Sequence, residues 1–198
     1  MLSNKESMNS EDIYRILTSD PYAGRIFTNV FPRDVFVDFL YAPPPRTNYI
    51  SVFNTQDKSK PGEHWIAFAK NEENGYYFDS YGRHPSTYPD VSRAMRCRFN
   101  QVIWNNLQLQ GLTTTACGDY CILFALLMSR GWSFERVVQT FTRYKTTEQR
   151  DHSVRNTLIH LYGKEAISSL RNERGGLIGK DNLHVKSAVD VIRLFASD

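Results

Sequence analysis

The chain has 198 residues, of which 41% are hydrophobic and 13% aromatic, enough to build one domain with a substantial buried core. No apolar run approaches the roughly 20 residues that a membrane-spanning helix needs, and the first residues are too polar for a secretory signal, so we expect a protein that is neither membrane-bound nor secreted. With 3 cysteines, which cannot all pair within the chain, and 5 histidines scattered without metal-ligand spacing, the composition indicates a reducing compartment and no metal site.

The formal net charge of +3 is unevenly distributed along the chain. Residues 1–90 carry 9 basic and 12 acidic side chains, a balance of −3, whereas residues 91–198 carry 15 basic and 9 acidic side chains, a balance of +6. In the basic half, Arg93, Arg96 and Arg98 follow one another with no acidic residue between them. Such a cluster is typical either of a solvated surface or of a patch that binds nucleic acid, and both interpretations stay open.

The first elements along the chain are expected to be helical. Ser10 has the properties of an N-cap, because Glu11 and Asp12 supply the acids that favour a first turn and apolar residues then recur at helical spacing. Irregular structure is expected from residue 25, followed by a short helix after Pro32.

The middle of the chain contains β-like runs at residues 49–53, 64–69 and 76–78. The dipeptide Asn74-Gly75 is a strong hairpin signal, so the second and third runs should be antiparallel neighbours. His64 begins the second run and Asp79 follows the third, and in this arrangement their side chains can meet at one end of the hairpin.

The second half of the chain is expected to contain mostly helices. The patterns predict a short basic helix over residues 91–96 and a strand over residues 99–104. A helix that is apolar on nearly every face should follow from Cys117 and end at Gly131, and Ser133 should cap the next helix. An amphipathic helix is expected over residues 154–161 and a last helix over residues 185–194. Glycines make residues 175–198 a candidate loosely attached tail. Together the elements predict a single domain over residues 1–198, α+β in class, with a central mixed β-sheet flanked by helices.

Residues 110–130 combine a polar loop with the apolar helix, and Cys117 lies where the two join. The first turn of a helix offers backbone N–H groups without intrahelical partners and the positive end of the helix dipole, which favour a thiolate and hold an oxyanion. A cysteine nucleophile also needs an imidazole, a carboxylate that orients it and donors for the oxyanion. His64, Asp79 and Gln110 supply these groups. Taken alone, each is more often structural, as a strand end, a turn cap or a loop residue, and Cys117 is more often a small core residue.

The joint pattern resembles a known family. The segments that carry it are Gly62-Glu63-His64-Trp65, then Tyr77-Phe78-Asp79-Ser80-Tyr81-Gly82, then Gln110-Gly111 followed by Ala116-Cys117-Gly118. These segments are similar to those of the adenovirus maturation proteases (adenain), which belong with the processing enzymes of ubiquitin-like proteins and share the chain order His, acid, Gln, Cys. The resemblance covers residues 10–165 and implies a catalytic cysteine at the N-terminus of the buried central helix.

Carried over position by position, the resemblance implies that Cys117 is the nucleophile, His64 the general base and acid, and Asp79 the group that orients the imidazole. It implies that the side-chain amide of Gln110 and the backbone N–H of Cys117 bind the oxyanion, and that Trp65 shields the His64 and Asp79 pair from water. The implied activity is that of a cysteine endopeptidase that cleaves viral capsid or core precursor proteins during virion maturation, in the virion and at the assembly site of the infected cell. The alternative is a protease that processes ubiquitin-like proteins.

The resemblance also implies activators, and here the sequence departs from the family. The adenovirus enzyme is activated by DNA and by a viral peptide that is disulfide-linked to one of its cysteines, so DNA and such a peptide are candidate activators, although the chemistry itself requires no cofactor. Cys97 is the candidate for the linkage, but it lies 13 residues before Gln110, on the basic segment. Asp79 also stands where the adenovirus enzymes have glutamate. These departures indicate a relative from a smaller DNA virus, a virophage or a virus-like transposon. We also expect the protein to be a monomer.

Overall fold

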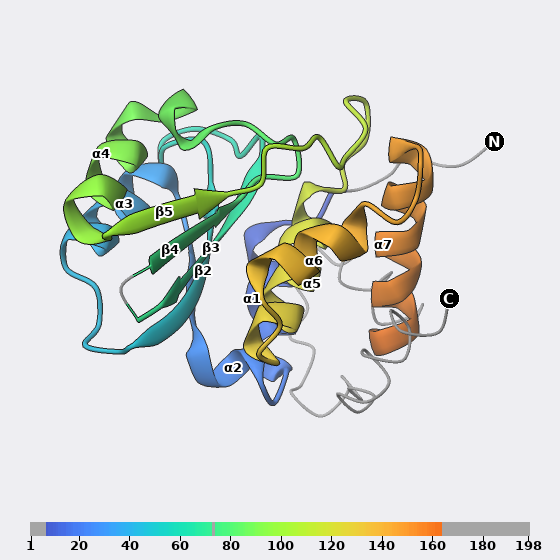
Figure 1. Cartoon of the computed structure of the whole chain (residues 1–198), viewed down its shortest axis with the longest axis horizontal. Helices are drawn as coiled ribbons and strands as arrows, with labels where there is room; N and C mark the ends of the chain where they lie inside the picture. The colour runs from blue at the N-terminus through green and yellow to red at the C-terminus, as the bar shows by residue number, and fades with distance from the viewer. Residues whose placement is uncertain (1–6, 73, 164–198) are drawn as a thin grey trace.

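The computed structural model describes residues 7–72 and 74–163 (Figure 1). Its elements, in chain order, are α1 (Ser10–Ser19), α2 (Ala23–Ile26), β1 (Phe27–Phe31), α3 (Arg33–Tyr41), β2 (Asn48–Asn54), β3 (Trp65–Asn71), β4 (Asn74–Phe78), the 3₁₀ helix η1 (Pro85–Thr87), α4 (Pro89–Arg98), β5 (Gln101–Trp104), α5 (Cys117–Ser129), α6 (Phe134–Phe141) and α7 (Thr147–Tyr162). The last predicted helix and the predicted tail, residues 175–198, lie outside the described residues. None of the described helices is both long enough and apolar enough to cross a membrane.

Among the described residues, five strands form one sheet in the order β1-β2-β3-β4-β5. β2, β3 and β4 are antiparallel neighbours, whereas β1 pairs parallel with β2, and β5 pairs parallel with β4. The sheet is therefore mixed, and helices cover both of its faces (Figure 1). The predicted α+β class is confirmed.

The alternation of side chains along β2, β3 and β4 divides the core into two parts. One face carries mostly small and branched residues, which pack on the side of α1, α5, α6 and α7: Ile50, Val52, Ala67, Ala69 and Phe78. The opposite face carries mostly aromatic residues, which pack on the side of α3 and α4: Tyr49, Phe53, Ile66, Phe68 and Tyr77. Because successive strand residues point to opposite faces, this alternation determines which layer each helix joins.

α5 packs against β3 and against α1, α6 and α7, and every residue from Cys117 to Leu127 is buried. The sequence predicted this, because apolar residues occupy nearly every face of the helix. After the helix ends, Gly131 has a φ of 80°, in the left-handed region that glycine adopts without strain. Ser133 then caps α6 by accepting the N–H of Arg136, as predicted.

Some local predictions near the N-terminus and in the hairpin were wrong. Residues 27–31 form β1 rather than irregular structure, because the strand is stabilised by its pairing with β2, an interaction between distant parts of the chain. The cap of α1 is Asn9 and not Ser10: Asn9 accepts the N–H of Asp12, and the Asp12 carboxylate accepts the N–H of Asn9. His64 precedes β3 instead of beginning it.

Candidate active site

His64 and Asp79 lie together at one end of the β3–β4 hairpin. His64 immediately precedes β3 and Asp79 immediately follows β4, so the antiparallel pairing brings both residues to the same edge of the sheet. Nε2 of His64 lies 2.7 Å from Oδ1 of Asp79, and the two residues are only 4% and 0% exposed. Charge-assisted hydrogen bonds of this length are strong. The structure therefore forms the contact that the hairpin signal predicted.

Asn105 and Tyr81 fix the position of Asp79. The Asn105 side chain accepts the N–H of Asp79 at 2.9 Å and donates to the carbonyl oxygen of Asp79 at 2.6 Å. The N–H of Tyr81 donates to Oδ1 of Asp79 at 2.8 Å. Asn105 follows β5, and because β5 is parallel to β4, the carboxyl ends of both strands meet at one edge. The sequence patterns did not predict Asn105, since its role follows only once β5 is known to be parallel to β4.

Cys117 is the first residue of α5 and is 6% exposed. The preceding residue, Ala116, supplies no side-chain cap to the first turn of α5. The Cys117 thiol lies beside the His64 imidazole, close enough for its charge to raise the pKa of His64. Because Asp79 holds Nε2, the other nitrogen of His64, Nδ1, is the one left to exchange a proton with the thiol. Nδ1 is buried and has no partner of standard hydrogen-bond geometry among the described residues.

The surroundings of His64 raise its pKa. Burial alone lowers the pKa, because it removes water from the imidazolium. The hydrogen bonds and negative charges of Asp79 and Cys117 more than offset burial, and the pKa of His64 rises from its ordinary value of 6.5 to about 9. His64 is therefore held as the imidazolium near neutral pH, the form that stabilises a thiolate and can protonate a leaving group.

Gln110 is fully buried, and hydrogen bonds orient its amide. Oε1 accepts the hydroxyl of Ser80 at 2.7 Å, and Nε2 donates to the carbonyl oxygen of Thr114 at 2.8 Å. A longer contact of 3.4 Å joins Nε2 to the hydroxyl of Tyr81. The sequence singled out Gln110 but not Ser80 or Tyr81 as site residues, although both directly follow Asp79 along the chain.

The loop that carries Gln110 is held from α7 by Asp151. Oδ2 of Asp151 accepts the N–H of Gly111 at 3.1 Å and the hydroxyl of Thr114 at 2.7 Å, and Oδ1 accepts the hydroxyl of Tyr120, on α5, at 3.0 Å. Asp151 is 7% exposed, so this buried carboxylate ties the loop, α5 and α7 together. No local pattern around Asp151 could predict this role, because its partners lie 31 to 40 residues away.

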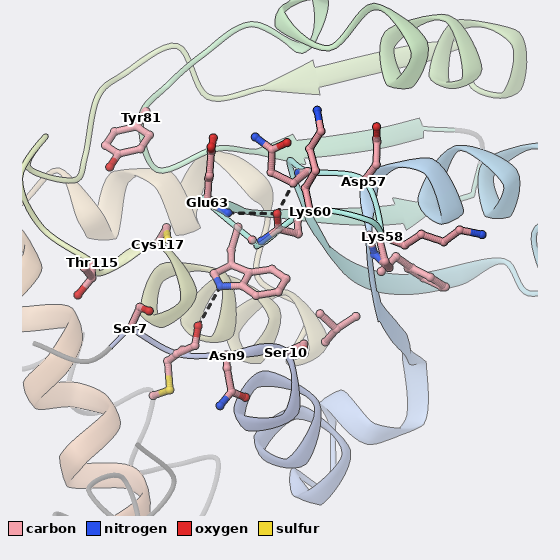
Figure 2. A pocket seen from close by; sticks show the side chains of 18 of the residues that line it. Ser7, Asn9, Ser10, Asp57, Lys58, Lys60, Glu63, Tyr81, Thr115 and Cys117 are labelled. Carbon is pink, nitrogen blue, oxygen red and sulfur yellow. Dashed lines mark hydrogen bonds between the residues drawn. The ribbon is translucent and has the colours of Figure 1, made fainter. Parts of the chain in front are cut away.

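A cleft of about 470 Å³ adjoins Cys117 (Figure 2). Trp65 contributes to its wall, and its Nε1–H donates to the carbonyl oxygen of Met8 at 3.0 Å. A Cβ at Gly118 would lie 2.7 Å from Cβ of Met8, so the glycine allows the N-terminal segment to pack on the first turn of α5. Charged residues line the cleft on the connection between β2 and β3: Asp57, Lys58, Lys60 and Glu63.

Trp65 was expected to shield the His64 and Asp79 pair from water. The structure places Trp65 in the cleft wall, next to the position that a Cβ of Gly118 would take. The ring that packs on His64 is that of Tyr81, with the two ring centroids 4.6 Å apart. The Tyr81 ring therefore covers the face of the imidazole that it packs on. Shielding of the His64 and Asp79 pair by Trp65 stays a prediction.

The predicted arginine cluster lies on α4, on the opposite side of the sheet from α5 (Figure 1). All of its arginines are exposed. At roughly 100° per helical residue, Arg93 and Arg96 share one side of α4, whereas Arg98 lies on a different side. Cys97 is also exposed on this helix. The structure does not bring these residues to Cys117, and a nucleic-acid contact stays a prediction.

Comparisons with known proteins find similarity to two viral proteins. No protein-family model matches it. It is 33% identical over 104 residues to the protein named "Putative thiol protease R355" of Acanthamoeba polyphaga mimivirus. That match covers 46% of this chain and 33% of the mimivirus protein, so the chain spans about a third of the length of this curated relative. Among solved structures it is similar to the ASFV pS273R protease, with 20% identity, a TM-score of 0.37, and coverage of 55% of this chain and 43% of that chain.

Proposed function

We propose that this chain is a viral cysteine endopeptidase. The observation that carries the proposal is the buried His64 and Asp79 pair, 2.7 Å apart, beside Cys117 at the start of α5. A thiol beside an imidazole that is hydrogen-bonded to a carboxylate is what thiol-based acyl transfer needs. The similarity over 104 residues to the mimivirus protein supports the same activity.

In the proposed reaction the Cys117 thiolate attacks a peptide carbonyl carbon, a C–S bond forms, and the carbonyl π electrons move onto oxygen. First-turn N–H groups of α5 and the Gln110 amide stabilise this oxyanion. The C=O bond then re-forms as the C–N bond breaks, and the leaving amine takes the proton from Nδ1 of His64. Water attacks the resulting thioester with His64 as the base, which releases the acid and restores the thiolate and imidazolium.

The proposed substrates are capsid or core precursor proteins, cleaved in the virion or at its assembly site. The cleft supports a polypeptide substrate, because it adjoins Cys117 and also reaches the charged residues between β2 and β3. DNA and a viral peptide are proposed as activators, with Arg93, Arg96 and Arg98 as the DNA contact. These proposals rest on the family resemblance and on the exposed arginines of α4.

The test compares wild type with Cys117→Ala on the structural precursors of the encoding genome and on a ubiquitin-like precursor that ends in Gly-Gly. We expect wild type to cleave the structural precursors and Cys117→Ala to be inactive but nearly as stable. Cys121→Ala is the matched control: this thiol is fully buried one turn further along α5, so the variant should keep activity and lose roughly 1 kcal/mol of stability. Cleavage by Cys117→Ala contradicts the proposed nucleophile, and cleavage of the Gly-Gly precursor alone supports the ubiquitin-like alternative.

A further inference from the structure

The hydroxyl of Tyr81 has no role in the reaction described above, yet its position is well defined. Tyr81 lines the cleft with Cys117, its ring packs on His64, and its backbone N–H donates to Asp79. Figure 2 shows the Tyr81 hydroxyl directed into the cleft, on the side of Cys117 and Thr115. The residue is therefore held at its backbone and at its ring, with its polar end in the space that a substrate would enter.

Gln110 is buried, and its amide contacts the Tyr81 hydroxyl. Gln110 is 0% exposed, and Nε2 donates one hydrogen to the carbonyl oxygen of Thr114 at 2.8 Å. Its other hydrogen faces the Tyr81 hydroxyl, at a donor–acceptor distance of 3.4 Å. The hydroxyl thus lies between the glutamine amide and the cleft. Because the Tyr81 oxygen can accept from Gln110, its own O–H hydrogen can donate to an acceptor in the cleft.

The surroundings of Tyr81 keep its hydroxyl protonated. Burial, and next the negative charge of Cys117, raise the pKa of Tyr81 above its ordinary value of 10.0. The guanidinium of Arg83, 4.8 Å from the ring centroid, acts in the opposite direction but does not reverse the shift. At neutral pH the cleft therefore contains a neutral O–H donor within electrostatic range of Cys117.

We propose that the Tyr81 hydroxyl is a catalytic oxyanion donor and that Gln110 acts through it. In the tetrahedral intermediate the Tyr81 O–H donates a hydrogen bond to the oxyanion without transferring its proton. The Gln110 N–H donates to the Tyr81 oxygen and so strengthens that donor. The backbone N–H of Cys117 binds the same oxyanion. This inference rests on the proposed peptidase activity and changes how Gln110 takes part in it.

The test is Tyr81→Phe, which keeps the ring on His64 and removes only the hydroxyl. With a precursor-derived peptide, turnover should fall on the order of 100-fold with an unchanged Michaelis constant, because the hydroxyl acts on the transition state. A peptide aldehyde adds reversibly to Cys117 and places its oxygen at the same position, so its affinity should weaken by a similar factor. Tyr144→Phe is the matched control, since Tyr144 is 40% exposed and lies outside the cleft lining.

A double variant separates a relay from two independent donors. If Gln110 acts through Tyr81, adding Gln110→Ala to Tyr81→Phe lowers turnover little further, whereas losses that multiply overturn the relay. Unchanged turnover and aldehyde affinity in Tyr81→Phe, or a raised Michaelis constant at unchanged turnover, overturn the catalytic role of the hydroxyl and leave the peptidase standing. Wild-type protein without Cys117-dependent cleavage overturns the proposed function itself, and the role of Tyr81 with it.

Discussion

Asp79 controls the protonation of His64, because its charge and hydrogen bond oppose the effect of burial. In wild type the imidazolium is lost as the pH rises through about 9, so kcat/KM should decline on the alkaline side near that value. Asp79→Asn removes the charge, and the decline should then begin at a lower pH. Profiles of kcat/KM against pH measure the shift, and Asp38→Asn, which changes an exposed carboxylate on α3, is the control. Superimposable profiles for Asp79→Asn and wild type would contradict the assignment.

The same pKa gives the direction of a stability effect. The pKa of about 9 in the folded protein lies above the ordinary value of 6.5, so the folded state binds the His64 proton more tightly than the unfolded chain. The resulting stabilisation is complete below pH 6.5 and is lost as the pH rises through about 9. Urea unfolding of wild type and Asp79→Asn over this range should show the larger loss of unfolding free energy in wild type.

At the residue scale, the sequence predicted the reactive groups but not the groups that hold them. Cys117, His64, Asp79 and Gln110 stand out because their chemistry and chain order are jointly constrained. Their supports are Asn105, Ser80, Tyr81 and Asp151, each an ordinary polar or aromatic residue by type. Their roles arise from contacts between segments that are distant in the chain, which one sequence without its pairing does not reveal.

At the element scale, prediction succeeded where the local signal and the tertiary contact agree. The β3–β4 hairpin has a turn dipeptide, and α5 is apolar on nearly every face. β1 was missed because its sequence does not alternate in polarity and its hydrogen-bond partner, β2, is parallel and follows another helix. The parallel pairing of β5 with β4 could not be predicted from the sequence either, although this pairing brings Asn105 to Asp79.

The junction between α1 and α5 depends on a buried ion pair. Arg130 donates to both carboxylate oxygens of Asp20, at 3.1 and 2.7 Å, and the two side chains are 2% and 0% exposed. Arg130→Ala leaves the Asp20 charge buried without its partner, so the free energy of unfolding should fall by about 3–5 kcal/mol in urea titrations. Arg15→Ala, which breaks the exposed pair with Glu11, should cost less than about 0.5 kcal/mol and is the control.

A second variant distinguishes two causes of this loss of unfolding free energy, an unpaired buried charge and poorer packing. Asp20 also accepts the N–H groups of Tyr22 and Ala23, which an asparagine can still accept. Asp20→Asn combined with Arg130→Met should therefore recover much of the stability that Arg130→Ala loses. If the double variant is as unstable as Arg130→Ala, the loss comes from packing and not from an unpaired charge.

The contact between α7 and the loop that carries Gln110 connects an element to the proposed chemistry. Asp151 holds Gly111 and Thr114, and the Thr114 carbonyl oxygen accepts from Gln110, so Asp151→Ala should lower turnover by displacing the Gln110 amide. Asp151→Asn keeps one acceptor oxygen for Gly111 and Thr114 and should retain most of the turnover. In the Gln110→Ala background, the effect of Asp151→Ala on turnover should disappear. An equal loss in both backgrounds would show that Asp151 acts independently of Gln110.

At the scale of the whole molecule, the candidate active site and the basic helix lie on different sides of the sheet. The cleft opens beside α5, whereas α4 packs on the aromatic face with α3 (Figure 1). A polyanion bound to the exposed arginines of α4 would lie on the other side of the sheet from Cys117. This arrangement is compatible with the proposed activation by DNA.

The corresponding prediction concerns salt. Each phosphate that an arginine neutralises releases counterions, so binding to duplex DNA, with a Kd of roughly 1–100 μM, should weaken steeply as salt increases. Arg93 and Arg96 share one side of α4, so replacing both by alanine should reduce the slope of log Kd against log salt by about 0.9 for each phosphate that is no longer neutralised. Arg25→Ala is the matched control, because Arg25 is an exposed arginine on α2 rather than on α4, and its slope should stay near the wild-type value. Cleavage of a short peptide without DNA should be the same in all variants. If duplex DNA at low salt changes neither the mobility of the protein nor the rate of precursor cleavage, α4 is an ordinary solvated surface and the activation by DNA is refuted.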